Sequence, residues 1–328
     1  MTVEPKACVL VKGTAGLGNR MLCVLTASLY AVVTGRRLLV DWRDPLFTGR
    51  SGSAPDLFCE LFVSPLADPL PEKIESRSVA PSLWQDRLND TVGVLGRDHD
   101  PLFFQKFGSF RNLAIRLGRT DYPEDVLVFW SFREVMRPIK AHLIRLDQRY
   151  RKMSDLEILR DAAKKYLQPC ERVQSITNQF VSENYRKRML GLHIRATDLQ
   201  APVEKLLRVA GQLVKKYNCD GVFCATDNAE VEVRARQMLP NVITLPKELP
   251  KGSIPLHYDP NCQDRVERAT QALVDMLLLS RCPILAYASR SSFGYVATIF
   301  APEGQVAIDV DRFNPKVQGK RFLRSWIY

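Results

Sequence analysis

Three groups of polar and ionic side chains in the C-terminal half of the chain have the chemistry of an anion-binding site. In chain order they are His193, Arg195, Thr197 and Asp198, then Thr226, Asp227 and Asn228, then Ser289, Arg290, Ser291 and Ser292. An arginine keeps its charge and donates two parallel hydrogen bonds, which suits a diphosphate. Serines at the start of a helix add free backbone amides and the positive end of the helix dipole. The groups together predict a nucleotide or sugar-nucleotide site.

Each group also has a simpler explanation. The second and third groups could only cap the helices that follow them. His193 alone could be a hydrogen-bonded histidine of the core, and Arg195 could pair only with Asp198 or Asp227. The recurrence of such groups after three neighbouring apolar segments favours the binding site.

The site requires strands that end side by side, and the second half of the chain supplies them. Apolar segments predict strands, and helical spacing predicts helices between them. The strands are at 188–195, 221–225, 242–245, 283–287 and 306–309, and the helices at 203–217, 229–239, 264–281 and 292–301. Strands that alternate with helices form a doubly wound parallel sheet, whose ligands lie beyond the carboxyl ends of the strands.

The N-terminus of the chain predicts a second unit of the same kind. A strand at 7–11, a glycine-containing turn at 13–20, a helix at 19–34 and a strand at 37–42 follow one another. This order is a βαβ unit, which belongs to a parallel sheet. Its ligand-binding edge would be at the turn.

The glycine-containing turn does not match the common phosphate-binding motifs. A P-loop would have Lys and Ser or Thr where Asn19 and Arg20 stand, and the glycine spacing differs from the dinucleotide fingerprint. The turn instead predicts that Gly16 and Gly18 let the backbone approach a ligand closely, with Arg20 just inside the helix. Close packing of helix on strand is the alternative role of these glycines.

The length of 328 residues suits two domains. A helical run over 134–168 gives way to a polar stretch, so we place the domains at 1–175 and 176–328. Residues 44–125 hold many of the prolines and predict irregular loops and short helices, and residues 126–130 predict a strand.

Composition narrows the partners and the location. The net charge of +11 suggests polyanion binding, but both halves of the chain share the excess and there is no basic arm, which argues against nucleic acid. The eight cysteines form no CxxC pair and the four histidines are scattered, so we expect free thiols and no metal.

The apolar run at 21–33 is too short for a bilayer and predicts a buried helix. With no export signal at the N-terminus, we expect a cytoplasmic protein without a transmembrane segment.

The motifs, in their order, resemble a known family. They span about residues 8–310, and they resemble the fucosyltransferases with an HxRxxD-type motif, above all those of glycosyltransferase family 23. The motifs are Gly16-Leu-Gly-Asn-Arg20, Thr34-Gly-Arg-Arg-Leu-Leu-Val-Asp-Trp-Arg43, His193-Ile-Arg-Ala-Thr-Asp198, Cys224-Ala-Thr-Asp-Asn228 and Val274-Asp-Met-Leu-Leu-Leu-Ser-Arg-Cys282.

The resemblance implies an α/β, GT-B-like fold with two Rossmann-type parallel-sheet domains facing a cleft. The second domain would bind a GDP-fucose donor, the first would be the acceptor side, and transfer would proceed with inversion and without a metal or other cofactor. The resemblance assigns Arg195 to the β-phosphate, His193 to the neighbourhood of the donor, Asp275 to guanine, Ser291 and Ser292 to phosphate, Asp227 and Asn228 to the pocket, and Gly16, Gly18, Asn19 and Arg20 to the diphosphate.

The acceptor side is less defined. Many relatives carry a second basic residue after the motif arginine, where this chain has Ala196, and the carboxylate of eukaryotic members would fall at Val203. Asp198 and Glu204 are therefore both candidates for the catalytic base. We expect a fucosyltransferase that acts on an oligosaccharide or glycoconjugate. The alternatives are a transferase for another nucleotide sugar and a non-catalytic GDP- or sugar-nucleotide-binding protein. Whether the basic surface contacts an anionic acceptor or a membrane surface is left open.

Overall fold

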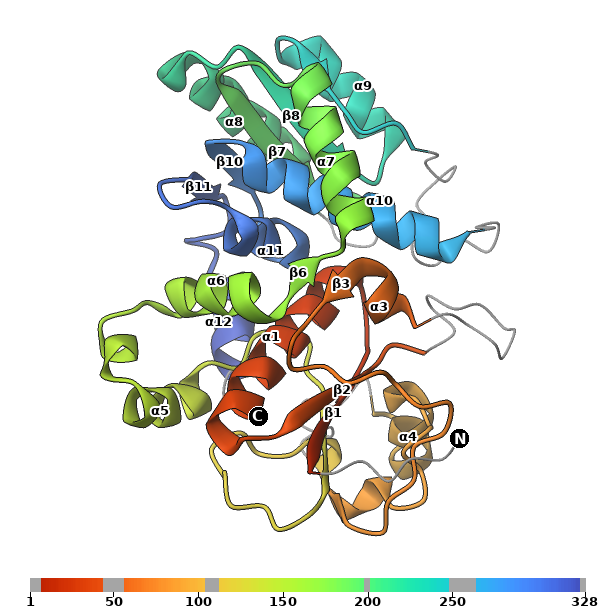
Figure 1. The fold of residues 1–328 in the computed structure, drawn as a ribbon. Helices are drawn as coiled ribbons and strands as arrows, with labels where there is room; N and C mark the ends of the chain where they lie inside the picture. Colours follow the sequence, from red (N-terminus) through yellow and green to blue (C-terminus); the bar gives the residue numbers. More distant parts are fainter. Residues whose placement is uncertain (1–6, 44–55, 104–111, 198–200, 248–263, 325–328) are drawn as a thin grey trace. The chain divides into compact units, whose positions relative to one another are not determined.

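The computed structural model describes residues 7–43, 56–103, 112–197, 201–247 and 264–324. They form two compact units, each with a parallel sheet of its own (Figure 1). The first unit runs to residue 168 and includes the end of the last helix from Arg321, and the second comprises residues 169–320. The predicted boundary at 175 lies after this division, within helix α7 (Glu171–Asn184) of the second unit.

The sheet of the first unit contains four strands. They are β1 (Cys8–Lys12), β2 (Arg37–Asp41), β4 (Val79–Ala80) and β5 (Val126–Phe129), in the order β2-β1-β5-β4 and all parallel. The predicted strands at 7–11, 37–42 and 126–130 are confirmed. The segment that contains β4 was predicted to be irregular, because two residues are too few to show a strand pattern.

The remaining elements of the first unit surround this sheet. They are α1 (Leu17–Thr34), α3 (Leu57–Leu61), β3 (Phe62–Val63), η1 (Ser82–Trp84), α4 (Val92–His99), α5 (Arg137–Leu146), η3 (Gln148–Arg151), α6 (Asp155–Tyr166) and β6 (Gln168–Pro169). The prediction that 134–168 is helical is confirmed, and the segment is divided into α5, η3 and α6. The side chains of Asp147 and Ser154 accept hydrogen bonds from the backbone N–H of Arg149 and Glu157, and each begins a new helix.

Helix α1 is the core helix of the first unit. By length and composition it could cross a membrane, and it is the only described helix for which this holds. However, 78% of its apolar window is buried inside the protein, where it packs against β1, β2, α5 and α6. The prediction of a buried helix is therefore confirmed.

The second unit contains a five-stranded parallel sheet. Its strands are β7 (Met189–Ile194), β8 (Gly221–Thr226), β9 (Val242–Ile243), β10 (Ile284–Tyr287) and β11 (Val306–Asp309), in the order β11-β10-β7-β8-β9. The chain runs outward from central β7 to β9 and then returns to add β10 and β11 on the other side. This is the Rossmann order, and the five predicted strands are confirmed.

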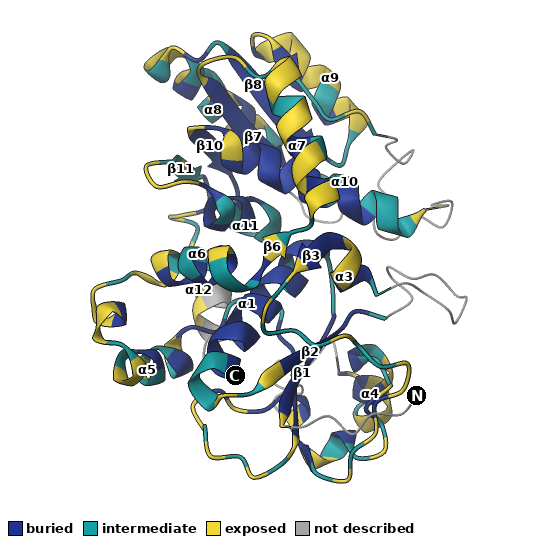
Figure 2. Ribbon diagram, viewed as in Figure 1, coloured by how far each residue is buried: buried dark blue, intermediate teal, exposed yellow. Residues whose placement is uncertain are grey.

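Helices cover both faces of the second sheet. Besides α7 they are α8 (Val203–Tyr217), α9 (Ala229–Met238), α10 (Arg265–Arg281) and α11 (Ser292–Phe300). The last helix, α12 (Pro315–Arg324), follows β11, and its end from Arg321 belongs to the first unit. Leu190, Leu192 and Ile194 of β7 face the apolar cluster formed with α8 and α9. The alternate residues Gly191 and His193 face the side of α10 and α11, so the buried strands lie between two helical layers (Figure 2).

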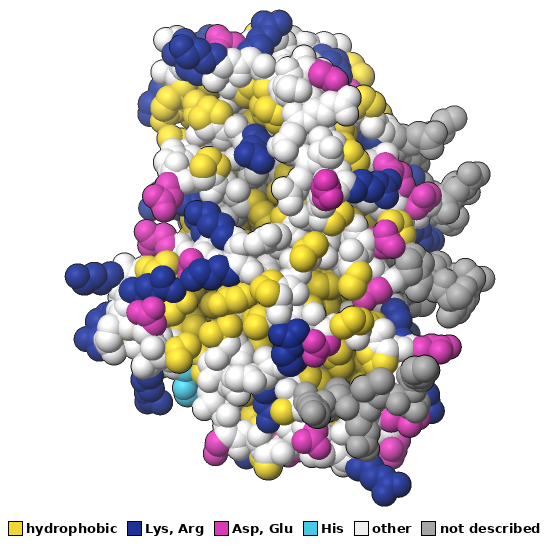
Figure 3. Space-filling model, in the orientation of Figure 1, with side chains coloured by type: hydrophobic (Ala, Val, Ile, Leu, Met, Phe, Trp, Pro, Cys, Tyr) yellow, Lys and Arg dark blue, Asp and Glu magenta, His cyan; other side chains and the backbone are white. Residues whose placement is uncertain are grey.

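On the face shown in Figure 3, the charged side chains do not gather by sign. On the face shown in Figure 3, Lys and Arg are interspersed with Asp and Glu over both units. Several charged side chains at the surface form ion pairs, such as Arg37 with Asp68 and Arg172 with Glu267. On this face, the net charge of +11 is therefore spread over the surface rather than concentrated in one basic patch.

Candidate functional site

The carboxyl ends of β7 and β10 define the candidate site. These neighbouring strands are the point at which the order of the sheet reverses, and ligands of doubly wound sheets bind beyond such a point. The imidazole of His193 on β7 stacks on the ring of Phe293 in the first turn of α11, with centroids 4.7 Å apart and planes at 7°. The structure thus brings two of the predicted groups, those after β7 and β10, together.

His193 is held in its neutral form. Burial, together with the positive charges of Arg195 and Lys247, lowers the pKa of His193 to about 3. A neutral imidazole can donate one hydrogen bond and accept another. His193 can therefore orient a ligand beside Arg195 but does not add to the positive charge of the site.

We predict that His193 does not titrate between pH 8 and pH 5 in the folded protein. Its Cε1 proton, followed by NMR, should keep one chemical shift, while the urea-unfolded chain titrates near pH 6.5. Because the unfolded state then binds a proton that the folded state does not, stability should fall as the pH falls below about 6.5. Between pH 7 and pH 5 the loss should be about 2 kcal/mol. His193→Gln should remove this slope, and a folded-state titration near pH 6.5 would contradict the prediction.

Asp227 organises the segment that follows β7. Its Oδ1 accepts a hydrogen bond from the backbone N–H of Ala196 at 2.8 Å, and its Oδ2 accepts one from the hydroxyl of Thr197 at 2.5 Å. These bonds join the end of β8 to the two residues that directly follow Arg195. Arg195 is half-buried at this edge of the sheet. Asp227 thus has a positioning role that the capping explanation did not include.

Two residues of the predicted groups cap helices, as the simpler explanation proposed. Asn228 Oδ1 accepts from the backbone N–H of Val231 at 3.1 Å, and Ser291 Oγ accepts from that of Phe293 at 3.4 Å. Ser291 is also buried, and Ser292 begins α11. Capping holds the N-terminus of α11 beside His193, where its positive dipole end favours an anion.

A buried ion pair, which the sequence patterns did not reveal, fixes the loop after β10. Asp311 follows β11, and both its oxygens accept from the guanidinium of Arg290 at 2.8 Å. Burial would raise the pKa of Asp311, but Arg290 holds it below its usual value. Asp309 adds a bond from the backbone N–H of Ser289 at 2.9 Å. The aspartates at the end of the 306–309 strand were the available signal for this contact.

Asp275 lies in the buried part of α10 and has a partner that sequence reasoning missed. Its Oδ2 accepts a hydrogen bond from Nζ of Lys247, which follows β9. Burial raises the pKa of Asp275, although Lys247 opposes the shift. The two residues are 28 positions apart, so their pairing depends on the order of the strands.

Of the two candidate bases, the structure describes only Glu204. Asp198 lies outside the described residues. Glu204 is exposed in the first turn of α8 and forms an ion pair with Arg234 of α9. Its role as a base stays a prediction. Within the described part of the chain, His, Cys, Asp and Glu form no group of three that could hold a metal ion.

The glycine-containing turn of the first unit also has the predicted local form. Gly16 precedes α1 as its N-cap, Gly18 and Asn19 lie in its first turn, and Arg20 is buried. The Nε of Arg20 donates to the carbonyl of Ala15 at 2.9 Å. A Cβ at Gly13 would lie 2.1 Å from a guanidinium nitrogen of Arg20 and 2.8 Å from Cδ1 of Trp42, so a side chain there would displace these neighbours. Close packing is thus part of the role of the glycine-containing turn.

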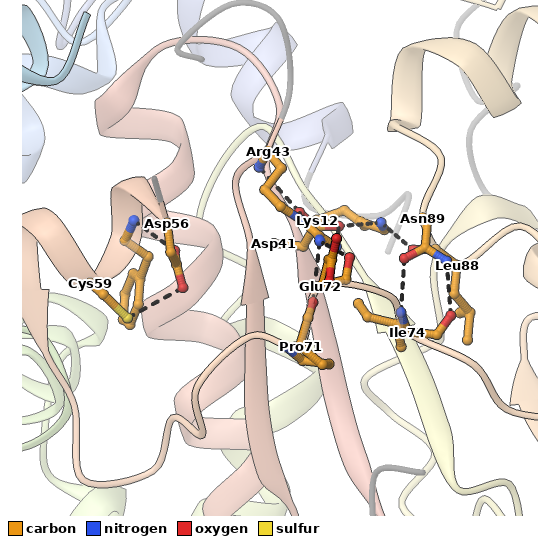
Figure 4. Close-up of polar contacts among 11 residues, drawn as sticks. Lys12, Asp41, Arg43, Asp56, Cys59, Pro71, Glu72, Ile74, Leu88 and Asn89 are labelled. Atoms are coloured by element: carbon orange, nitrogen blue, oxygen red, sulfur yellow. Dashed lines mark hydrogen bonds and ion pairs between the residues drawn. The ribbon is translucent and has the colours of Figure 1, made fainter. Parts of the chain in front are cut away.

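A buried polar cluster supports this turn at the ends of β1 and β2 (Figure 4). Lys12 Nζ donates to Asp41 Oδ2 at 2.6 Å and to the carbonyl of Leu88 at 2.5 Å, and Arg43 Nε donates to Asp41 Oδ1 at 3.0 Å. Burial would raise the pKa of Asp41, but Lys12 and Arg43 hold it below its usual value. The backbone N–H of Gly13 donates to the carbonyl of Asp41 at 2.8 Å, so the cluster anchors the start of the turn.

Two parallel α/β units, with polar residues at the carboxyl edge of each sheet, are the architecture of the GT-B glycosyltransferases. The predicted fold class is confirmed by solved structures. NodZ fucosyltransferase from Bradyrhizobium superimposes with a TM-score of 0.63 over 94% of this chain and 96% of its own, at 19% identity. FUT1 of Arabidopsis thaliana gives a TM-score of 0.56 over 92% of this chain and 72% of its own, at 15% identity. The cleft between the two domains stays a prediction.

Sequence comparison finds plant relatives. Probable fucosyltransferase 9 of Arabidopsis thaliana is 25% identical over 313 residues, which cover 86% of this chain and 57% of the relative. Galactoside 2-alpha-L-fucosyltransferase of the same plant is 32% identical over 110 residues, 27% of this chain and 18% of the relative. The chain thus spans at most a little over half the length of these relatives. No family model matches the chain.

Proposed function

We propose that the protein is a fucosyltransferase that moves fucose from GDP-fucose to a hydroxyl of an oligosaccharide or glycoconjugate, with inversion and without a metal. The relatives found by sequence are named as fucosyltransferases, and the NodZ structure of the same fold was soaked with GDP-fucose. The observation that carries the proposal is the grouping of His193, Arg195 and the N-terminus of α11 at the reversal point of the second sheet.

This grouping fits the chemistry of a departing diphosphate. When the bond between fucose C1 and the β-phosphate oxygen breaks, negative charge grows on the diphosphate. Arg195 and the amides at the start of α11 would stabilise that charge, because fixed donors cost no reorganisation during the reaction. Asp227 holds the two residues that directly follow Arg195 and so would keep its guanidinium in place.

The acceptor hydroxyl must lose its proton as its oxygen bonds to fucose C1 from the opposite side. A carboxylate would take this proton. Asp198 and Glu204 are the two candidates, and Glu204 forms an ion pair with Arg234. The seven described cysteines are free thiols, which supports a cytoplasmic location.

Radiolabelled donor tests the proposal directly. The full chain should transfer labelled fucose from GDP-fucose to one member of a panel of chitin-type, N-glycan-core and lipopolysaccharide acceptors, and transfer should persist in EDTA. Anomeric analysis of the product by NMR should show inversion. Binding of GDP-fucose without transfer to any member of a broad panel would favour a non-catalytic binding protein. Preference for another nucleotide sugar would overturn the donor assignment.

A further inference from the structure

A buried ammonium and a buried carboxylate meet beyond the end of β9. The side chains of Lys247 and Asp275 are 10% and 3% exposed, and Nζ of the lysine contacts Oδ2 of the aspartate. The other oxygen, Asp275 Oδ1, is buried and accepts no hydrogen bond from the described residues. A buried charged oxygen without a partner is costly. It is therefore a position that the N–H of a ligand would fill favourably.

We propose that Lys247 is a specificity-determining residue, which together with Asp275 forms a donor–acceptor pair that reads the base of the nucleotide donor. The inference rests on the proposed function, because it concerns the same donor site. Guanine presents the O6 acceptor beside the N1–H and N2–H donors. The ammonium of Lys247 donates to O6, and Asp275 Oδ1 accepts from the ring N–H or the amino group.

The same pair rejects adenine by its chemistry. Adenine carries an amino group where guanine has O6 and an unprotonated ring nitrogen where guanine has N1–H. Its amino group would face the ammonium of Lys247, and its ring nitrogen would face the carboxylate of Asp275. A donor would then face a donor, and an acceptor would face an acceptor. Buried polar groups left unpaired in this way discriminate strongly between two ligands.

Lys247 also sets the charge of Asp275. The titratable groups around this carboxylate are Lys247 after β9, Glu232 on α9, Tyr185 before β7 and Cys224 on β8. Lys247 is the cation among them, and it opposes the rise in the pKa of Asp275 that burial causes. Without Lys247 the carboxyl would hold its proton to higher pH, and a protonated acid is a poorer acceptor for the N–H groups of guanine.

Calorimetry on the full chain, with GDP and ADP as probes, tests the proposal. The wild-type protein should prefer GDP, and Lys247→Met should lower GDP affinity about 10- to 100-fold, the range for a hydrogen bond to a charged group. ADP affinity should change little. GDP affinity of Lys247→Met should also depend more steeply on pH than that of the wild type, because Asp275 without Lys247 ionises only at higher pH. Lys247→Arg should restore most of the preference.

Two further variants guard the interpretation. Lys165→Met breaks a surface pair with Asp161 and should leave the GDP preference unchanged. Lys247→Met combined with Asp275→Asn removes both buried charges, so it should fold, as judged by circular dichroism, and should lack the preference. A Lys247→Met protein that keeps the wild-type ratio of GDP to ADP affinity overturns the proposal but leaves the proposed function intact. A wild-type protein that binds no GDP overturns both.

Discussion

Replacing Arg195 with alanine should lower kcat/KM for fucose transfer about a thousandfold, which corresponds to about 4 kcal/mol of transition-state stabilisation. Arg195 follows the central strand of the second sheet, and its charge acts on His193, whose ring stacks on Phe293 in the first turn of α11. The charge of a departing diphosphate would grow at this edge of the sheet. Part of the loss should appear in the ground state, because GDP already carries the phosphate charges. Calorimetry should therefore show weaker GDP binding as well.

Matched variants separate this role from a general charge effect. Arg195→Lys keeps the charge but loses the planar pair of donors, so it should lie between the wild type and the alanine variant. Arg188→Ala removes an exposed arginine at the amino end of the same strand and should leave kcat/KM unchanged. Unchanged GDP affinity in Arg195→Ala, or equal affinities of the wild type for GDP and UDP, would refute the donor assignment.

The strand ends could be predicted from the sequence because the signals are local. Apolar runs such as 189–194 and 221–226 are followed at once by polar residues, and parallel strands bring such ends to one edge. Local hydrogen bonding also accounts for the caps at Asn228 and Ser291, which need only the next two or three residues. These positions required no knowledge of the strand order.

The ion pairs that stabilise the site could not be predicted in this way. Arg290 meets Asp311 only because β11 lies beside β10. Lys247 meets Asp275 only because α10 packs against β7 and β8, and β9 lies beside β8. The resemblance singled out Asp275, which by its residue type alone is a polar residue in an apolar helix. The short strand β4 was missed because two residues show no period.

The cluster of the first unit yields the other large expected effect. Asp41→Ala should destabilise that unit by about 3–5 kcal/mol, because it leaves the buried ammonium of Lys12 without its counter-ion. Urea unfolding followed by tryptophan fluorescence measures this unit selectively. Trp42, Trp84 and Trp130 are buried in it, and the second unit, residues 169–320, has no tryptophan. Trp84 lies under the Lys12 ammonium, 5.4 Å from it, and so reports on the cluster itself.

A comparable exposed pair provides the control. Arg37 and Asp68 also link β2 to the segment that follows it, but both side chains are 44% exposed, so Asp68→Ala should cost less than about 1 kcal/mol. Replacing both buried charges, Lys12→Met with Asp41→Leu, should recover much of the stability lost in Asp41→Ala, because no unpaired buried charge of the pair remains. If Asp41→Ala costs no more than Asp68→Ala, the cluster does not stabilise the unit as we infer. Because the carbonyl of Asp41 also holds the backbone of Gly13, a destabilised cluster should loosen the glycine turn and with it any contact that this turn makes to a ligand.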